Sequence, residues 1–271
     1  MTDARRGELL DDDLVEVFLS PVRLSAAYKP AFGKGKLGGV DYEAFQTLYG
    51  GDAFYSWLGL HDPVMYAAHK AAGGLTSVYR QIGVGSERLL RRILAERFRL
   101  SNEQLAWSYT YTRDDGMPAE LALDARISLM DLEAESKRRL GAWLATTYST
   151  MPKPSSGAID PEGIVMEIRQ GYKSADSKRQ NADVRYGMRA YQAKLLPTVV
   201  VMSNQVSEPV LRRYRADGIL VLTGDLDGSS AHSTFSFFKE VVDYDLAGFF
   251  ERNTGRIAQE VTAVVQALLT P

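Results

Sequence analysis

The sequence contains no cysteine, which excludes disulfide bonds and thiolate metal sites. Its histidines, His61, His69 and His232, have no partner acids at ligand spacing, so neither a zinc site nor a His-based catalytic triad is indicated. It also lacks an apolar run of the roughly 20 residues that a membrane-spanning helix needs, and no secretory leader is recognisable. We therefore expect a cytoplasmic protein with no membrane partner.

The sequence also has no large excess of positive or negative charge. The 271 residues include 32 Lys and Arg against 34 Asp and Glu, and this balance does not by itself demand a nucleic-acid partner. The hydrophobic content of 45% suits the core of a soluble globular protein. Basic side chains are instead concentrated locally, between residues 169 and 194. Any contact with a polyanion is therefore expected in that segment.

The first part of the chain, residues 1–105, is predicted to be mainly helical. Aromatic and aliphatic residues between 42 and 98 are typical of packed helices, and Gly73-Gly74 predicts a loop-like interruption over residues 73–81. Ser101 and Gln104 have the spacing of a capping box at a helix start. Residues 131–148 predict a further helix with acids in its first turn, including Glu133 and Glu135.

The C-terminal part predicts alternating strands and helices. Two β-branched runs separated by Pro161-Glu162-Gly163 predict a β-hairpin over residues 157–169. A helix over 175–195, a buried strand over 198–202, a helix starting at Ser207 and a buried strand over 219–223 are expected to follow. This order predicts an α/β fold. The apolar stripe of the last helix either closes the core or forms a subunit contact.

The expected hairpin brings charged residues together. Side chains alternate along a strand, so Glu167 and Arg169 share one face, and Asp160 is expected to lie alongside Glu167 across the hairpin. Two adjacent carboxylates repel unless a cation lies between them, and a hard divalent ion with oxygen ligands is the usual one. Asp124 is an alternative first acid, but its distance in sequence from Glu167 favours Asp160.

Asp160, Glu167 and Arg169, with the order of elements that follows them, resemble the PD-(D/E)XK nuclease superfamily and, more narrowly, type II restriction endonucleases. In that family an Asp, then an acid and a Lys two residues apart on the next strand, bind Mg²⁺ and activate water. The resemblance implies a restriction-endonuclease-like central mixed sheet flanked by helices. It assigns residues 106–271 to the catalytic core, with the helical residues 1–105 packed on it.

The resemblance also implies a function. The chain would be a sequence-specific double-stranded DNA endonuclease that hydrolyses phosphodiester bonds with Mg²⁺ held by Asp160 and Glu167. Arg169 departs from the family's Lys, and because Arg rarely gives up its proton it is a poor general base. Lys173 is close enough in sequence to take that place, so Arg169 or Lys173 would stabilise the charge that grows on the phosphate. A symmetric target site would require a homodimer.

Base-reading residues are implied at the start of the helix that follows the metal-binding strand, where long polar side chains suit base edges. The candidates for DNA binding are Lys173, Ser174, Asp176, Lys178, Arg179, Asn181 and Arg185. An ordinary polar helix start, capped by Ser174 or Asp176, explains the same composition.

Other interpretations remain open. Glu133 or Glu135 would assist the metal site in the resembled family, and compensation of the helix dipole accounts for them equally well. A structure-specific or repair nuclease of the same superfamily would share the site without a fixed target. A non-catalytic DNA-binding module with a degenerate site is the third possibility, and Arg169 is the residue that supports it.

Overall fold

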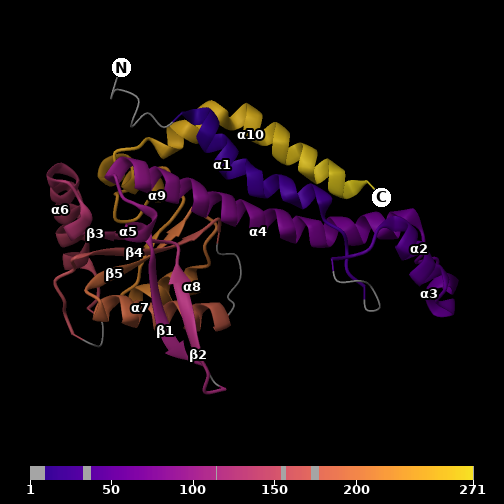
Figure 1. Cartoon of the computed structure of the whole chain (residues 1–271), viewed down its shortest axis with the longest axis horizontal. Helices are drawn as coiled ribbons and strands as arrows, with labels where there is room; N and C mark the ends of the chain where they lie inside the picture. Colours follow the sequence, from indigo (N-terminus) through magenta and orange to yellow (C-terminus); the bar gives the residue numbers. More distant parts are fainter. Residues whose placement is uncertain (1–9, 33–37, 114, 154–156, 172–176, 271) are drawn as a thin grey trace. The chain divides into compact units, whose positions relative to one another are not determined.

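The structure, a computed structural model, describes residues 10–32, 38–113, 115–153, 157–171 and 177–270, and in the first turns of one helix, over 177–182, it describes the backbone only. These residues fall into two compact units (Figure 1). One contains Ser86–Glu251, and the other contains Asp11–Gly85 and Arg252–Pro271. The division falls within two long helices, α4 (Pro63–Phe98) and α10 (Leu246–Leu269), so the last helix contributes to both units.

The second unit is helical, as the sequence predicts. Besides its parts of α4 and α10 it contains α1 (Asp11–Arg23), η2 (Leu24–Ala27), α2 (Tyr42–Gly50) and α3 (Ala53–Trp57). Val264 and Leu268 of α10 pack with Val78 of α4, so the apolar stripe of the last helix closes a core.

The interruption expected over residues 73–81 is wrong, because α4 continues through it. A side chain at Gly74 would collide with Leu268, and one at Gly85 would collide with the backbone of Phe18. These glycines therefore allow close approach between helices, which outweighs their cost of about 1 kcal/mol each to helix stability.

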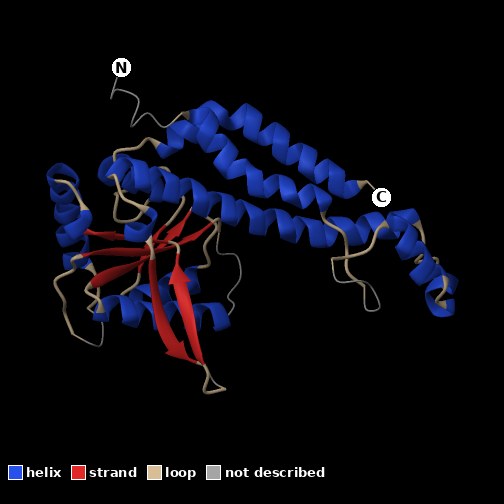
Figure 2. Cartoon of the chain, viewed as in Figure 1, coloured by secondary structure: helices blue, strands red, loops and turns tan. Residues whose placement is uncertain are grey.

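The first unit is built on a mixed four-stranded sheet (Figure 2). The strand order is β3-β4-β5-β6, with β3 antiparallel to β4 and the other pairs parallel. A separate antiparallel hairpin pairs β1 with β2. The elements of this unit, after its part of α4, are α5 (Asn102–Leu105), β1 (Trp107–Thr112), β2 (Pro118–Leu123), β3 (Ala125–Ser128), η3 (Leu129–Asp131), α6 (Ala134–Thr150), β4 (Gly163–Arg169), α7 (Ser177–Gln192), β5 (Leu195–Val201), α8 (Glu208–Ala216), β6 (Leu220–Leu222), α9 (Thr234–Phe237) and η4 (Phe238–Val242).

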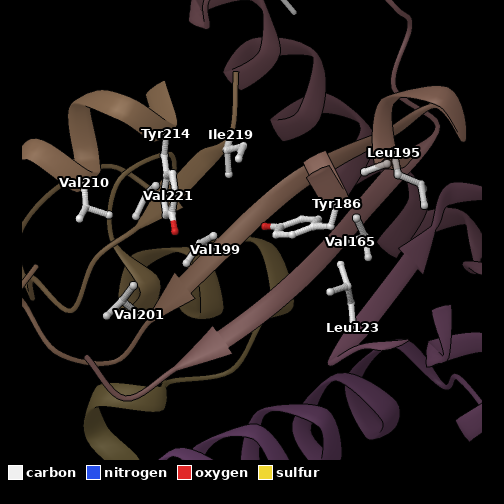
Figure 3. Close-up of a cluster of buried hydrophobic side chains, with 11 residues drawn as sticks. Leu123, Val165, Tyr186, Leu195, Val199, Val201, Val210, Tyr214, Ile219 and Val221 are labelled. Carbon is white, nitrogen blue, oxygen red and sulfur yellow. The ribbon is translucent and has the colours of Figure 1, made fainter. Parts of the chain in front are cut away.

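Both faces of the sheet are buried, which explains why the parallel strands have continuous apolar sequences. Tyr186 of α7 and Tyr214 of α8 pack on one face with Val165, Val199 and other aliphatic side chains (Figure 3). Ile164 and Met166 of β4 alternate with Val165 and are buried on the opposite side. The α/β class, the mixed sheet, the helical N-terminal part and the capping box of Ser101 with Gln104 are thus confirmed.

The hairpin expected over residues 157–169 does not form. The chain has one strand there, β4, and residues 157–162 lead into it without strand structure. The antiparallel partner of β4 is β3, where Gly163 pairs with Ser128. A Cβ at Gly163 would meet the carbonyl oxygen of Ile127, so the glycine that suggested a tight turn instead permits close pairing of two strands.

None of the helices within the described ranges combines the length and the apolar character that crossing a membrane requires.

Candidate functional site

Asp124 and Glu167 lie opposite each other at one end of the β3–β4 pair. Ala125, the first residue of β3, pairs with Met166, so Asp124, which directly precedes β3, lies next to Glu167, which follows Met166 on β4. Two backbone-directed hydrogen bonds fix this position. The amide of Asp124 donates to the carbonyl oxygen of Met166 at 3.1 Å, and the amide of Ile168 donates to Asp124 Oδ2 at 2.6 Å. The charge of Glu167 acts on Asp124, so the two carboxylates are neighbours.

The environment of Asp124 opposes its ionisation. Burial is the main cause and the negative charge of Glu167 the second, and together they raise the pKa of Asp124 from 3.8 to about 8. Glu87 of α4 adds a smaller repulsion, while the hydrogen bond from Ile168 and the charge of Arg169 act in the opposite direction. Burial and the neighbouring acids therefore outweigh the groups that favour the ionised form of Asp124.

Arg169 lies two residues beyond Glu167 on the same face of β4, and its side chain is only 8% exposed. Its Nη2 lies 2.7 Å from Asp183 Oδ1 of α7 and 3.4 Å from Glu167 Oε1. Asp183 also accepts a hydrogen bond from the hydroxyl of Tyr214 on α8. The guanidinium group is thus held between the acid pair and the helices that cover the sheet.

Tyr186 adds a buried hydroxyl to this region. Its pKa is raised well above the ordinary value, first by burial and then by the charge of Asp183. The hydroxyl finds no hydrogen-bond partner among the described residues. Figure 3 shows its ring beside Val165 and Val199 within the core.

Asp160 is placed elsewhere. It is exposed and precedes β4, and its charge acts on Lys194, which directly precedes β5. The first residue of β5, Leu195, pairs with Gly163 at the beginning of β4. Glu167 lies four residues further along β4, about 13 Å away at the usual rise per residue. The structure therefore brings Glu167 together with Asp124 and Arg169, and does not bring it together with Asp160.

Most of the predicted DNA-binding residues cannot be located as side chains. Lys173, Ser174 and Asp176 lie outside the described residues, and Lys178, Arg179 and Asn181 lie in the first turns of α7, where only the backbone is described. Arg185 is exposed on α7, with its guanidinium carbon 6.0 Å from the ring centroid of Tyr111.

The two candidate assisting acids are engaged at the surface. Glu133 lies before α6 and forms an ion pair with Arg99 at 2.9 Å, and Glu135 pairs with Arg138 at 2.8 Å. Both pairs are largely exposed. Their geometry agrees with surface ion pairing of the acids at the start of a helix.

Sequence reasoning recognised Asp124 as a second choice and missed Asp183 and Tyr214. Asp183 is a carboxylate on the buried side of α7, in register with the apolar residues Tyr186 and Ala190, and that pattern was a detectable signal. Tyr214 gave no comparable signal, because a tyrosine on the apolar face of a helix is an ordinary core residue.

The arrangement supplies closely spaced oxygen ligands with a neighbouring cation. Within the residues that the structure describes, no cluster of three or more Asp, Glu or His side chains is gathered for metal binding. A divalent ion at Asp124 and Glu167 would therefore complete its coordination with water or substrate oxygens. Searches of protein-family models, curated proteins and solved structures gave no match for this chain.

Proposed function

We propose that the chain is a Mg²⁺-dependent DNA endonuclease in which Asp124 and Glu167 form the acid pair. The proposal depends on one observation: an acid directly before one strand lies next to the first residue of an acid-x-base sequence on the adjacent strand. The resembled PD-(D/E)XK superfamily has an acid and an acid-x-Lys sequence on consecutive strands. The mixed strand directions and the strand-helix-strand order after β4 agree with that family's core.

The residues fit the ion. Mg²⁺ prefers hard oxygen ligands and is commonly bound through one or two carboxylates, with the remaining positions taken by water and phosphate oxygens. Asp124 uses Oδ2 for the amide of Ile168, and its Oδ1 accepts no hydrogen bond from any residue that the structure describes. The pKa of Asp124 is raised first by burial and then by the charge of Glu167, and a divalent cation bound between the two carboxylates would offset both effects.

When bound, the ion supplies Lewis-acid polarisation of a phosphoryl oxygen and a water of lowered pKa. The chain's own contribution is to position and balance charge. The amide of Ile168 orients Asp124, and Asp183 orients Arg169, whose positive charge lies beside Glu167. Arg169 would stabilise negative charge that develops on the phosphate, and its high pKa makes it unsuitable as the base.

In its more specific form, the proposal is that the enzyme belongs to the type II restriction class, cleaves at specific sites and is a homodimer. Double-stranded DNA is the substrate, and the start of α7 follows β4 closely enough in sequence for its polar residues to read bases. Asp160, exposed before β4, keeps a metal role only if its removal abolishes cleavage.

Cleavage of a defined plasmid by the purified chain, with Mg²⁺ or with EDTA, tests the proposal. We expect Mg²⁺-dependent cuts at discrete positions, and a loss of about a hundredfold or more in Asp124→Asn and in Glu167→Gln, since a bound metal contributes several kcal/mol. Asp160→Asn is the matched control and should cut at the wild-type rate. A mobility-shift assay should show that all three variants still bind DNA.

The results of the cleavage assay distinguish the alternative metal ligands and the alternative functions. Normal cutting by Asp124→Asn together with loss in Asp160→Asn would return the metal site to Asp160. Cutting without defined positions would indicate a structure-specific or repair nuclease. If the wild-type chain cleaves DNA with none of the divalent ions tested, that result would contradict the proposal as a whole.

The non-catalytic DNA-binding module is a second candidate, favoured by one observation. Arg169 replaces the family's Lys and forms a buried ion pair with Asp183, which is an arrangement that stabilises structure without supplying a base. Sequence-selective DNA binding without nicking, in Mg²⁺ or Mn²⁺, would support this candidate.

A further inference from the structure

A cavity of about 270 Å³ lies between the β1–β2 hairpin and helix α7, away from the acid pair. Its walls come from two sets of side chains within one compact unit. The hairpin contributes Tyr109, Tyr111 and Leu121, and the helix contributes Arg185, Met188, Arg189 and Gln192.

The local structure explains why these side chains converge. Trp107, Tyr109 and Tyr111 alternate with exposed residues along β1 and are half-buried on one face of the hairpin. Trp107 and Tyr109 pack against the core beneath α7. Arg185, Met188, Arg189 and Gln192 recur at helical spacing, so they form one exposed face of α7.

The chemistry of the lining is aromatic and cationic. Two tyrosine rings lie across from two arginines, and no carboxylate of a described side chain lines the cavity. Among the described residues no acid forms an ion pair with Arg185 or Arg189; Arg189 donates instead to Gln192 Oε1 at 3.0 Å. Both arginines are exposed on α7, so their charges are available to a ligand that enters the cavity.

Size and charge together select the ligand. The cavity, at about 270 Å³, lies just below the range of about 300–1,000 Å³ that is typical of small-molecule sites, so it suits one small planar group and excludes a duplex. Nucleobases stack on tyrosine, and arginine binds phosphate through paired hydrogen bonds. Gln192 offers an amide suited to a base edge.

We propose that this cavity binds a single nucleotide, with its base against Tyr109 and Tyr111 and its phosphate at Arg185 and Arg189. Resting on the proposed function, the natural occupant is an unpaired nucleotide of the DNA substrate, held apart from the acid pair. Nucleotide binding itself needs neither metal nor catalysis.

Titration of the full chain with deoxynucleoside 5′-monophosphates, without divalent ions, tests this site by calorimetry or by the fluorescence of Trp107. We expect saturable binding. Stacking contributes on the order of 1–3 kcal/mol per base, so Tyr111→Leu should weaken binding about fivefold to a hundredfold. Arg189→Gln should weaken nucleotide binding by about tenfold or more while leaving the weaker binding of the uncharged nucleoside unchanged.

Matched controls lie on the same elements and nearby. Thr110→Ala changes the opposite face of β1, and Arg212→Gln removes an exposed arginine of α8; both should bind like the wild type. Absence of saturable binding at millimolar nucleotide, or equal binding by Tyr111→Leu, Arg189→Gln and the controls, would overturn the site.

The same titration of Glu167→Gln separates this inference from the proposed function. Glu167→Gln should bind the nucleotide normally although it cuts no DNA, whereas normal nucleotide binding by a wild-type chain that cuts no DNA with any divalent ion would retain the cavity as a nucleotide site and reject the nuclease. Mg²⁺-dependent cutting by a chain that binds no nucleotide would reject the cavity alone.

Discussion

Each compact unit contains one group of acidic and basic side chains, and the two groups differ in their burial and in how their charges are paired. In the helical unit, arginines of α1 and α10 are matched with acids at the surface. This network, called here the α1–α10 network, consists of Asp11, Asp12, Glu16, Arg23, Arg252, Arg256 and Glu260. In the other unit, buried charges meet beside the sheet. This second group, called here the sheet cluster, consists of Asp124, Glu167, Arg169 and Asp183.

The pKa values of the acids in the two groups shift in opposite directions. The pKa of Glu260 is lowered, chiefly by its hydrogen bond with Arg23, so the folded state favours its charged form. The pKa of Asp124 is raised, chiefly by burial and then by Glu167. Balanced surface charges therefore stabilise the fold modestly, whereas the sheet cluster keeps an acid under repulsion. Such a strained arrangement is more typical of a functional site than of a structural one.

Removal of Arg169 should have the largest effect on stability. Arg169→Met leaves Asp183 and Glu167 without their nearest cation, and breaking a buried ion pair costs about 3–5 kcal/mol. Urea unfolding at neutral pH measures this loss. Arg256→Met in the α1–α10 network is the matched control and should cost about 1 kcal/mol or less. Equal losses in the two variants would erase the distinction between the groups.

The second-largest effect should be a pH dependence of the free energy of unfolding that is caused by Asp124. Its pKa is 3.8 ordinarily and about 8 in the folded state, so the fold holds this proton more tightly than the unfolded chain does. The stability contributed by the proton is therefore complete at low pH and is lost as pH rises from about 4 to about 8. Relative to Asp124→Asn, the wild type should lose on the order of a few kcal/mol across that window.

Unfolding curves collected between pH 4 and pH 8, with and without Mg²⁺, provide this measurement. Asp160→Asn should follow the wild-type slope, since Asp160 is exposed and distant from Glu167 along the strand. Under the proposed function, Mg²⁺ at a hundred times its dissociation constant should restore about 2.7 kcal/mol at the upper end of the window. A flat wild-type profile would show that the negative charge is already neutralised within the protein.

The smallest effect is expected for Glu260. Because its folded pKa lies below 4.5, its contribution is complete above that value and is lost as pH falls. Glu260→Gln should lower stability at neutral pH by about 1 kcal/mol or less, and added salt should reduce the difference. Thermal unfolding in low and high salt measures both. A loss as large as that of Arg169→Met would mean that the surface network is a main support of the helical unit.

Sequence reasoning succeeded where the signal was local. The helices at 134–150, 177–192 and 208–216 and the strands β5 and β6 follow from apolar spacing and capping residues. It failed at Gly74 and Gly163, where glycine serves close packing and not a loop or turn. A glycine in the sequence indicates only that a side chain would not fit at that position. Close packing against a segment distant in the chain requires glycine just as a turn does, so the sequence does not distinguish the two.

The amino-acid order alone was enough to establish the α/β class and the helical N-terminal part and to single out Glu167 as a candidate, because each inference depends on neighbours within a few residues. The identity of the acid beside Glu167 required the folded chain. Strand pairing joins β3 to β4 across an intervening helix, and it brings Asp124, the residue before β3, next to Glu167 while Asp160 stays at the far end of β4. Register is set by the burial of whole strands against distant elements, so no local pattern encodes it.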